Sequence, residues 1–212
     1  MTDLQNPLVA AYPAADGNET RLRSERTRGL VMQAAHAPLY EETNQGNSWT
    51  ISTAVAGITT TALMVVSTAS AIPIVGLFNP DGSGKNLIVH RAIVCQVTGT
   101  STGFIWGVAA DPAMTASDGV ATGRNNKTFA SGGHIGRAFA GATAMVGTGV
   151  TYRSLGEPVA GIAYAAGLDT TFRDDVDGEI VVVPGNFVGV FATVAMAANI
   201  VRASLTWAEV PI

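Results

Sequence analysis

From residue 49 to the C-terminus, the sequence is a succession of segments typical of β-strands. Apolar and β-branched runs follow one another, separated by clusters of Gly, Pro, Asn and Asp such as 79–84 and 184–186. No ten-residue stretch combines a helical period with helix start and stop signals. Repeated strands without intervening helices predict an all-β fold, a sandwich or barrel, rather than an α/β fold. The predicted strands are 49–55, 60–66, 72–78, 87–97, 104–110, 160–166, 179–183, 187–196 and 201–210.

The charged residues are distributed unevenly and suggest two parts. Residues 1–42 hold 10 of the 28 charged side chains, and residues 43–212 hold the other 18. The first part has little apolar mass, so it needs a docking surface to become ordered. The sequence therefore predicts an N-terminal arm over 1–45, extended or partly helical between 18 and 36, and a β-sandwich domain over 46–212. Four arginines of the arm are candidate contacts with a partner: Arg21, Arg23, Arg26 and Arg28.

Two of the predicted strands indicate which surfaces are buried. In 201–210, apolar side chains alternate with Arg202, Ser204 and Thr206, as in a half-buried antiparallel strand. In 187–196, both faces are apolar, whereas one sandwich layer buries only one face in its own core. The second face is therefore expected to be covered by the arm or by a partner subunit. The candidate subunit contacts on this strand are Val188, Val190, Val194 and Met196.

Arg91 is a single charge in an apolar strand. It is predicted to lie on the face that carries Leu87, Val89 and Ile93. Because a charge in such a place is usually paired or at an interface, we expect an inter-strand or inter-subunit contact. Between residues 111 and 153 the strand signal is weak, which predicts long ordered loops or one further hairpin.

Two short motifs resemble catalytic or phosphate-binding loops. Residues 99–103 (GTSTG) match the nucleophile elbow, which would make Ser101 a catalytic serine, but that chemistry needs a helix after the turn. The strand that follows predicts a hairpin, and a serine hydrolase is the alternative. Residues 79–86 resemble part of a phosphate-binding loop. The required first glycine is replaced by Asn79, and Asn86 follows Lys85, so a tight hairpin is predicted here too.

The sequence shows no set of metal ligands. The acidic segment Asp174–Glu179 fails the calcium-loop pattern at two positions and is predicted to be a loop before a strand, with cation binding as the alternative. His36, His90 and His134 share no ligand spacing, and Cys95 is the single cysteine. We expect no catalytic residue, no metal and no cofactor.

Nucleic acid and membrane are not expected as partners. The net charge is −4 and no broad cluster of Lys and Arg is present. Residues 58–78 are long enough to cross a bilayer, but they are rich in Thr and Ser and include Pro73 and Gly76. Two buried strands joined near 67–70 are predicted instead. The polar N-terminus has no secretory leader pattern.

Four segments resemble a family of structural proteins from tailed bacteriophages. The first is 37–47 (APLYEETNQGN), before the first strand, and the second is 76–87 (GLFNPDGSGKNL), a strand followed by an Asn-Pro-x-Gly-Ser-Gly turn. The others are the turn 184–187 (PGNF) and the end 204–212 (SLTWAEVPI). Together they cover about a third of the chain, and nothing in 111–153 takes part.

This resemblance implies a non-enzymatic virion protein, a decoration or cement protein on the capsid outer surface. It implies a jelly-roll-like antiparallel sandwich and a homotrimer that binds the major capsid protein, with terminal extensions gripping the capsid protein or each other. Tyr40, Glu41 and the arm arginines are then contact candidates. Avidity from several weak contacts would stabilise the shell. The alternative virion function is a tail or fibre receptor-binding module, which should expose aromatic or carbohydrate-contacting loops, whereas the three Trp residues fall in predicted strands.

Overall fold

The computed structural model describes residues 23–24, 30–31, 39–61, 65–66, 71–100, 102–110, 122–141, 149–156, 163–164, 170–194 and 199–212. In these residues the elements are β1 (Arg23–Ser24), β2 (Leu30–Val31), α1 (Tyr40–Gln45), β3 (Ser48–Ser52), β4 (Ile58–Thr59), β5 (Val75–Phe78), β6 (Lys85–Thr100), β7 (Phe104–Ala110), β8 (Arg124–Asn125), β9 (Arg137–Phe139), β10 (Val150–Gly156), β11 (Ala163–Tyr164), β12 (Thr170–Val182), β13 (Asn186–Ala192) and β14 (Ile200–Pro211).

The chain divides into two units, 1–40 and 41–212, so the boundary lies five residues before the one expected from the sequence. In the first unit, β1 pairs antiparallel with β2, with Arg23 opposite Val31. The described residues of the arm are therefore extended chain, one of the two forms expected there, and they pair as two short strands. The helix α1 (Tyr40–Gln45) lies after the stretch 18–36 in which partly helical chain was expected, so the sequence did not predict it.

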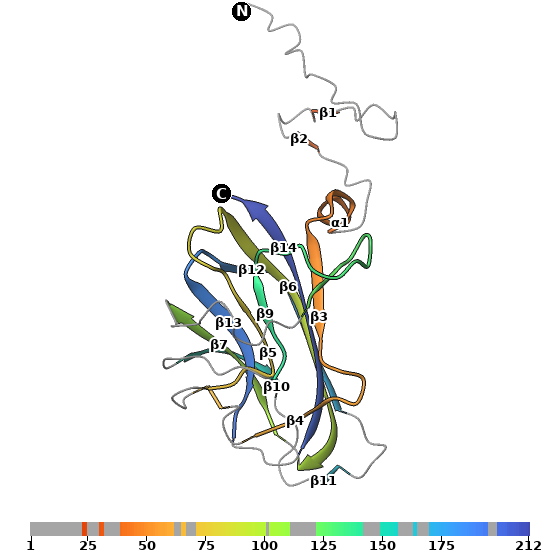
Figure 1. Ribbon diagram of the computed structural model, residues 1–212, viewed down its shortest axis with the longest axis vertical. Coiled ribbons are helices and arrows are strands. Elements are labelled where there is room, and N and C mark those ends of the chain that lie inside the picture. The colour runs from red at the N-terminus through yellow and green to blue at the C-terminus, as the bar shows by residue number, and fades with distance from the viewer. Residues whose placement is uncertain are drawn as a thin grey trace, which may run out of the picture. The chain divides into compact units, whose positions relative to one another are not determined.

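The second unit is an all-β antiparallel sandwich, as predicted (Figure 1). One sheet has the strand order β10-β7-β13-β5-β9. In the other, the order is β11-β6-β14-β3-β8, with β12 also paired to β6 and β4 to β14. Many consecutive strands lie in different sheets, and the neighbouring strands β12-β6-β14-β3 and β10-β7-β13-β5 have the orders found in two Greek keys. This is a jelly-roll-like order.

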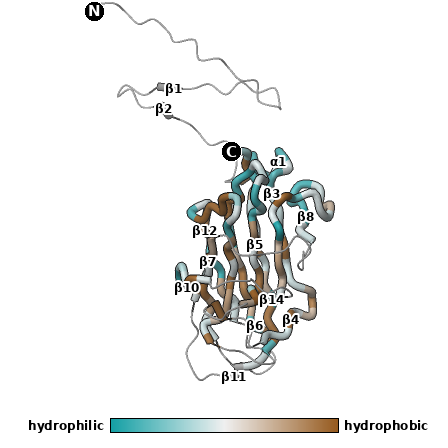
Figure 2. The backbone as a smooth tube through the Cα atoms, turned by 60° about the vertical axis from the view of Figure 1, so that its left-hand side comes forward, coloured by the Kyte–Doolittle hydropathy of each residue, from teal (hydrophilic) through white to brown (hydrophobic). Residues whose placement is uncertain are grey.

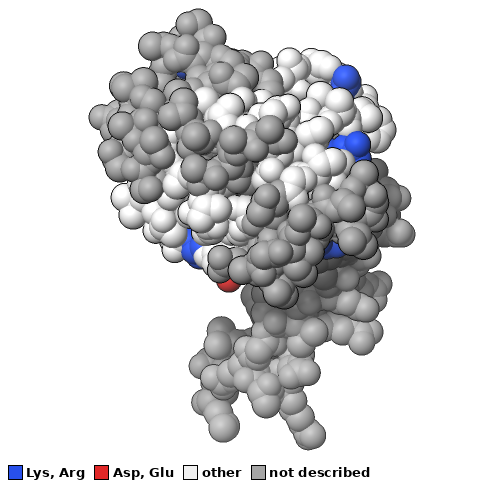
Figure 3. Space-filling model, turned by 90° about the horizontal axis from the view of Figure 1, so that it is seen from below, with Lys and Arg blue, Asp and Glu red and all other residues white. Residues whose placement is uncertain are grey.

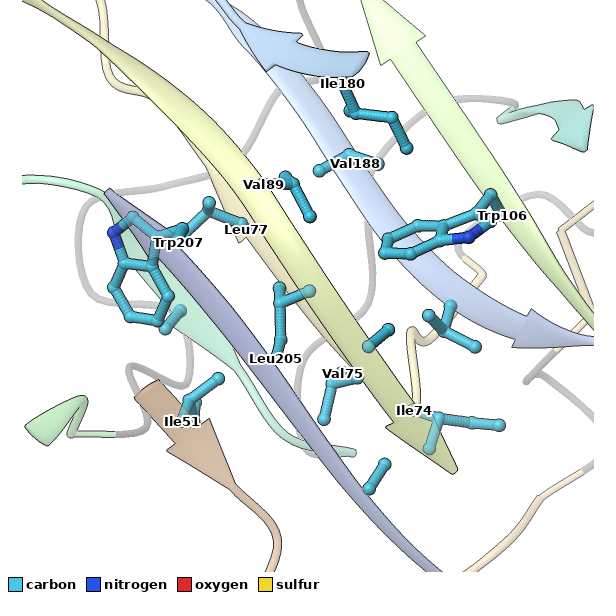
Figure 4. Packing of buried hydrophobic residues seen from close by; sticks show 14 of the residues in the cluster. Ile51, Ile74, Val75, Leu77, Val89, Trp106, Ile180, Val188, Leu205 and Trp207 are labelled. Carbon is cyan, nitrogen blue, oxygen red and sulfur yellow. The ribbon is translucent and has the colours of Figure 1, made fainter. Parts of the chain in front are cut away.

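The core lies between the two sheets and is built from alternate residues of their strands. Figure 4 shows side chains from both layers meeting there, among them Trp106, Val188 and Leu205, each 1% exposed or less. Burying one such side chain contributes about 1.5–3 kcal/mol. The strand of 201–210 behaves as predicted, because Val201, Leu205 and their alternates are buried and Arg202 is exposed. Figure 2 shows that the strands of the sandwich are largely hydrophobic along their middle.

The second face of β13 is covered by the chain itself, which corrects the expectation that the arm or a partner covers it. Phe187 and Phe191 pack with Val66 and Ala71, which belong to the connection between β4 and β5. The prediction of a strand over 60–66 is not confirmed. Among the described residues of that segment, only Val65 forms a β-bridge, to Ala192.

A row of glycines lets that connection approach the five-stranded sheet. Gly189 of β13 pairs with Gly76 on one side and with Gly107 on the other. A Cβ atom at Gly107 would lie 2.5 Å from the Val66 side chain and 2.7 Å from Phe191. Because real Cβ atoms do not approach so closely, the row must lack side chains for the second cluster to form.

Three turns connect the two sheets, and the sequence predicted two of them as hairpins between neighbouring strands. The segment 79–84 joins β5 to β6, 101–103 joins β6 to β7, and 183–185 joins β12 to β13. In each case the two strands belong to different sheets, so the predicted hairpins at 79–86 and 99–103 are wrong. Turn residues alone do not reveal whether the next strand returns to its neighbour or crosses to the facing layer.

A bulge in β6 changes which residues face the core. Trp207 pairs with Val89 and Thr206 with Arg91, so His90 is an extra residue in β6. Val89 is buried before the bulge, and after it the buried positions are Ala92 and Val94. The expected face of Arg91 is therefore wrong. A single extra residue reverses the alternation of all residues that follow it.

Candidate functional site

Residues from the segments 39–47, 76–87, 184–187 and 204–212 come together at one end of the sandwich, near α1 and the C-terminus (Figure 1). The backbone N–H of Glu209 donates to the carbonyl of Asn47 at 2.9 Å, and that of Ile212 donates to Gly84 at 3.2 Å. The N–H of Gly185 donates to the carbonyl of Asn79 at 2.8 Å. Residues far apart in the chain thus form one hydrogen-bonded unit, which we call the turn end: residues 46–47, 79–85, 182–186 and 209–212.

Asn79 holds two inter-sheet turns together at the turn end. It is fully buried, and its amide nitrogen donates to the carbonyls of Lys85 and Val182, both at 2.8 Å. Its backbone N–H also donates to Asn186 at 2.9 Å. A buried side-chain amide with two donors can satisfy two strand-terminal carbonyls at once. The Asn-Pro-x-Gly-Ser-Gly motif is therefore a corner of the sandwich rather than a phosphate-binding loop.

Glu209 is a buried carboxylate that ties the sheets together. It is 1% exposed, and its Oε1 accepts hydrogen bonds from the backbone N–H groups of Ile135 and Gly136, both at 2.8 Å. Its Oε2 forms an ion pair with Lys85 at 3.3 Å. Ile135 and Gly136 lead into β9 of the five-stranded sheet, whereas Glu209 belongs to the other sheet. A buried charge needs such partners to offset its lost hydration.

An aromatic group lies beside Glu209. The ring of His134 packs edge-on between Trp49 and Trp207, at centroid distances of 5.5 and 5.6 Å. Its Nε2 accepts from the N–H of Gly123 at 3.0 Å, which assigns the proton to Nδ1, and Nδ1 then donates to the carbonyl of Gly136 at 2.5 Å. Both ring nitrogens are used inside the fold. His134 therefore has a structural role, with no nitrogen free for a ligand.

A group of charged residues lies at the side of the sandwich formed by β10 and β12, away from β8 and β9. Asp174 of β12 accepts from Trp106 Nε1 at 2.7 Å and forms an ion pair with Arg153 of β10 at 2.5 Å. Arg153 also pairs with Glu179 at 2.7 Å. The hydrogen bonds that Arg153 donates to the Asp174 carboxylate are the largest cause that raises the pKa of Arg153. Asp174 therefore links strands of both sheets.

Arg91 makes the inter-strand contact that the sequence left as one of two possibilities. Its Nε lies 2.6 Å from Asp175 Oδ1 on the neighbouring β12, and Arg173 Nε lies 2.7 Å from the other oxygen. Arg173 first, and then Arg91, lower the pKa of Asp175. All three side chains are more than a third exposed, so this group adds little to stability.

The acidic segment 174–179 lies inside β12, so the prediction of a loop is wrong. Asp175 pairs with Arg91 and Ile180 with Val89, so residues 176–179 bulge out of the strand. Asp177 and Gly178 have φ angles of 48° and 90° in this bulge. The Asp and Gly residues that suggested a loop therefore indicate a bulge, because both types tolerate a positive φ.

His90 is buried beneath that bulge. It is 6% exposed, and neither ring nitrogen has a hydrogen-bond partner. Burial lowers the pKa of His90 below its ordinary value of 6.5, while the carboxylates of Glu42 and Asp177 oppose the shift. Among the described residues, no three His, Cys, Asp or Glu side chains are grouped to hold a metal ion. The imidazole is thus a buried neutral base.

A hydrogen-bonded turn after β8 presents an exposed aromatic side chain. Phe129 is 73% exposed and has a φ of 58°, which is rare for a bulky residue. Asn125 holds the turn: its carbonyl accepts from the N–H of Phe129 at 2.8 Å, and its Oδ1 accepts from the N–H of Lys127 at 3.0 Å. Arg124 also donates to the carbonyl of Phe129 at 3.2 Å. We call residues 124–130 the Phe129 turn; no sequence pattern marked it as a site.

The remaining candidate contact residues fall in different places. Val188 and Val190 are 1% and 0% exposed in the core between the sheets, so their prediction as subunit contacts is wrong. Val194 is 56% exposed, Tyr40 46% exposed, and Glu41 is exposed on α1. Arg23 lies in β1. Four candidates lie outside the described residues: Arg21, Arg26, Arg28 and Met196.

Ser101, the serine of the hydrolase alternative, also lies outside the described residues, as does His36. The three tryptophans lie in β3, β7 and β14, as predicted, and none is more than 9% exposed. Among the described residues, no helix has the length and apolar character needed to cross a membrane. No family model, curated protein or solved structure matches this chain.

Proposed function

We propose that this chain is a non-enzymatic structural protein of a tailed-bacteriophage virion. In this proposal it is a decoration or cement protein that binds the major capsid protein on the outer surface of the shell. It does so as a homotrimer, and it stabilises the assembled capsid because it binds that state preferentially. The chemistry is binding alone, spread over several copies so that modest contacts add up by avidity.

The observation that carries the proposal is the convergence of the four phage-like segments at the turn end. They are separated by up to about 160 residues in sequence, yet backbone hydrogen bonds connect Asn47, Asn79 and Gly84 to later segments. Because these segments meet, they form one continuous hydrogen-bonded part of the fold. The jelly-roll-like order agrees with a virion protein but carries no function by itself.

The polar clusters of the sandwich support binding rather than catalysis. Asn79, Glu209 and His134 direct their polar atoms into the fold, where they join its segments. The surface instead offers exposed apolar side chains next to charges, as at Phe129 and at Val181. Figure 3 views the end away from the turn end and shows few charged side chains among the described residues on that face.

Binding of the purified full-length protein to capsids that lack decoration proteins tests the proposal. Saturable binding, together with capsids that survive higher temperature, is the expected result. No binding by the full-length protein to such capsids would overturn it. A variant with alanine in place of Arg21, Arg23, Arg26 and Arg28 tests the arm: weaker binding is expected, and unchanged binding would exclude an arm contact.

A receptor-binding module of a tail or fibre is the second candidate, and Phe129 is the observation that favours it. Such a module should expose aromatic side chains on loops, and Phe129 is exposed on a turn. The three tryptophans, in contrast, are buried. Imaging of labelled protein on intact particles separates the two candidates: capsid labelling supports decoration, and labelling of the tail alone supports the receptor-binding module.

A further inference from the structure

Two exposed surfaces of opposite character lie on opposite edges of the seven-stranded sheet. The Phe129 turn follows β8 at one edge, and β12 is paired to β6 at the other (Figure 2). With strands about 4.8 Å apart, the four steps from β12 to β8 separate these surfaces by roughly 20 Å. One molecule therefore presents them on opposite sides, where they cannot meet each other.

The edge at β12 carries a surface that we call the β12 patch: Asp177, Glu179, Val181 and Val183. Beyond the bulge, Ile180 and Val182 face the core, so Val181 and Val183 point outward and are 46% and 42% exposed. Figure 2 shows this end of β12 as hydrophobic. Glu179 is 71% exposed and pairs with Arg153, and Asp177 forms no ion pair among the described residues.

The Phe129 turn is complementary to the β12 patch in both hydropathy and charge. Its exposed aromatic ring is flanked by Arg124 and Lys127, which are both exposed. Residues 122–137 contain three basic side chains and no carboxylate, although the whole chain has a net charge of −4. An aromatic side chain between cations fits an apolar surface between carboxylates.

The two surfaces also lie at the same level of the sheet. One lateral row of paired residues crosses it through Asn125, Trp49, Trp207, Val89 and Ile180. Asn125 begins the hydrogen-bonded turn that presents Phe129, and Ile180 lies between Glu179 and Val181. A copy placed beside the first would therefore bring its turn to the height of the neighbour's patch without a shift along the strands.

The turn is also held in the conformation that such a contact needs. Asn126 donates to Ser48 Oγ at 2.6 Å and accepts from Thr50 Oγ1 at 2.8 Å, while Asn125 donates to the carbonyl of Gly46 at 2.6 Å. Lys127 donates to the carbonyl of Asn44 in α1. Because the turn is ordered before binding, little conformational entropy is lost on association.

We infer that copies of this chain associate head to tail, with the Phe129 turn of one copy seated on the β12 patch of the next. The contact is heterologous, so it closes into a ring when the rotation between neighbours allows. This inference deepens the self-association in the proposed function and rests on that part of it. It does not depend on capsid binding, and the purified full-length protein tests it without capsids.

The experiment measures mass by sedimentation and light scattering over a range of protein concentrations. The unaltered protein should form oligomers, while Phe129→Ser and Val181→Lys should each weaken association by about tenfold or more. Tyr152→Ser is the matched control, because Tyr152 is an exposed aromatic (53%) on β10 of the other sheet, and it should leave the mass unchanged.

Mixing the two variants identifies the head-to-tail geometry. Each retains one intact surface, so the mixture should form 1:1 dimers that neither variant forms alone. If one substitution prevents folding, charge exchange serves instead: Lys127→Glu and Glu179→Lys should each weaken association, and the double variant should restore it. A monomeric unaltered protein, an unchanged mass for Phe129→Ser, or a mixture without dimers would each overturn the inference, whatever the capsid-binding result.

Discussion

The side-chain amide of Asn79 donates a 2.8 Å hydrogen bond to the backbone carbonyl of Val182, a residue 103 positions later in the chain. The same nitrogen donates to Lys85, so one buried side chain joins the ends of β6 and β12. Both strands begin or end at turns that cross between the sheets. The corner at the turn end therefore depends on an amide donor at this position.

Asn79 should be sensitive even to isosteric replacement. Asn79→Ala leaves two buried carbonyls without a donor and should lower the free energy of unfolding by about 2 kcal/mol. Asn79→Asp should lower it further at neutral pH, because a carboxylate would face the carbonyl oxygens of Lys85 and Val182. Urea denaturation of both variants measures the difference. Equal stability of the Asp variant and the unaltered protein would contradict this role.

Glu209 should contribute strongly to stability. Glu209→Ala removes the acceptor of the Ile135 and Gly136 N–H groups and the partner of Lys85, and should cost about 3–5 kcal/mol. Glu179→Ala is the control, because that carboxylate is 71% exposed and should cost less than about 1 kcal/mol. Chemical denaturation compares the two. Similar small losses for both would mean that the buried site gains little from its carboxylate.

Gly107 should not tolerate a side chain. In Gly107→Ala the new methyl group would overlap Val66 and Phe191, which should lower the free energy of unfolding by about 1–3 kcal/mol. Thr151 pairs with Gly107 on the neighbouring β10 and is exposed, so Thr151→Ala should change it by only about 0.5 kcal/mol. Thermal and urea unfolding check both. A neutral Gly107→Ala would show that the covering connection is loosely packed.

His90 should make the stability depend on pH. Because its pKa is lowered in the fold, the unfolded chain takes up a proton first as the pH falls below 6.5. As the pH falls from 6.5 to the pKa of His90 in the folded state, the free energy of unfolding should therefore decrease. Below that pKa, His90 should cause no further decrease. Stability should consequently be greater above pH 6.5.

His90→Leu removes the titrating ring and should flatten that part of the pH profile. Urea denaturation at a series of pH values compares it with the unaltered protein. The two profiles should converge or cross as the pH decreases. Profiles that stay parallel from neutral pH downward would show that protonation of His90 is not coupled to unfolding.

The sequence predicted several elements well because their patterns are local. The strand 104–110 has the bounds of β7, and the alternation in 201–210 is that of β14. Side chains that alternate between core and solvent leave a period of two in the sequence. The tryptophans were placed in strands for the same reason.

The errors occurred where a long-range contact decides the outcome. The pattern around Arg91 was interpreted without the bulge at His90, which appears only when β6 pairs with β14. Val188 and Val190 were expected at a subunit contact because both faces of β13 are apolar, but they lie on its core face, and Val66 and Ala71 cover the other face. The Phe129 turn was missed because its hydrogen bonds reach Gly46 and Ser48, about 80 residues earlier.

The sequence by itself determined that this chain folds as β-strands with a charged arm, because strand periodicity and charge density are properties of neighbouring residues. It also placed the corner motif 79–84 at a turn. Only the tertiary structure decided that this turn crosses between sheets and that Asn47, Asn79 and Glu209 lie at the same end of the sandwich. It likewise decided that Phe129 and Val181 lie on opposite edges. Strand pairing brings together residues that the sequence keeps far apart, and no local pattern records which strands will pair.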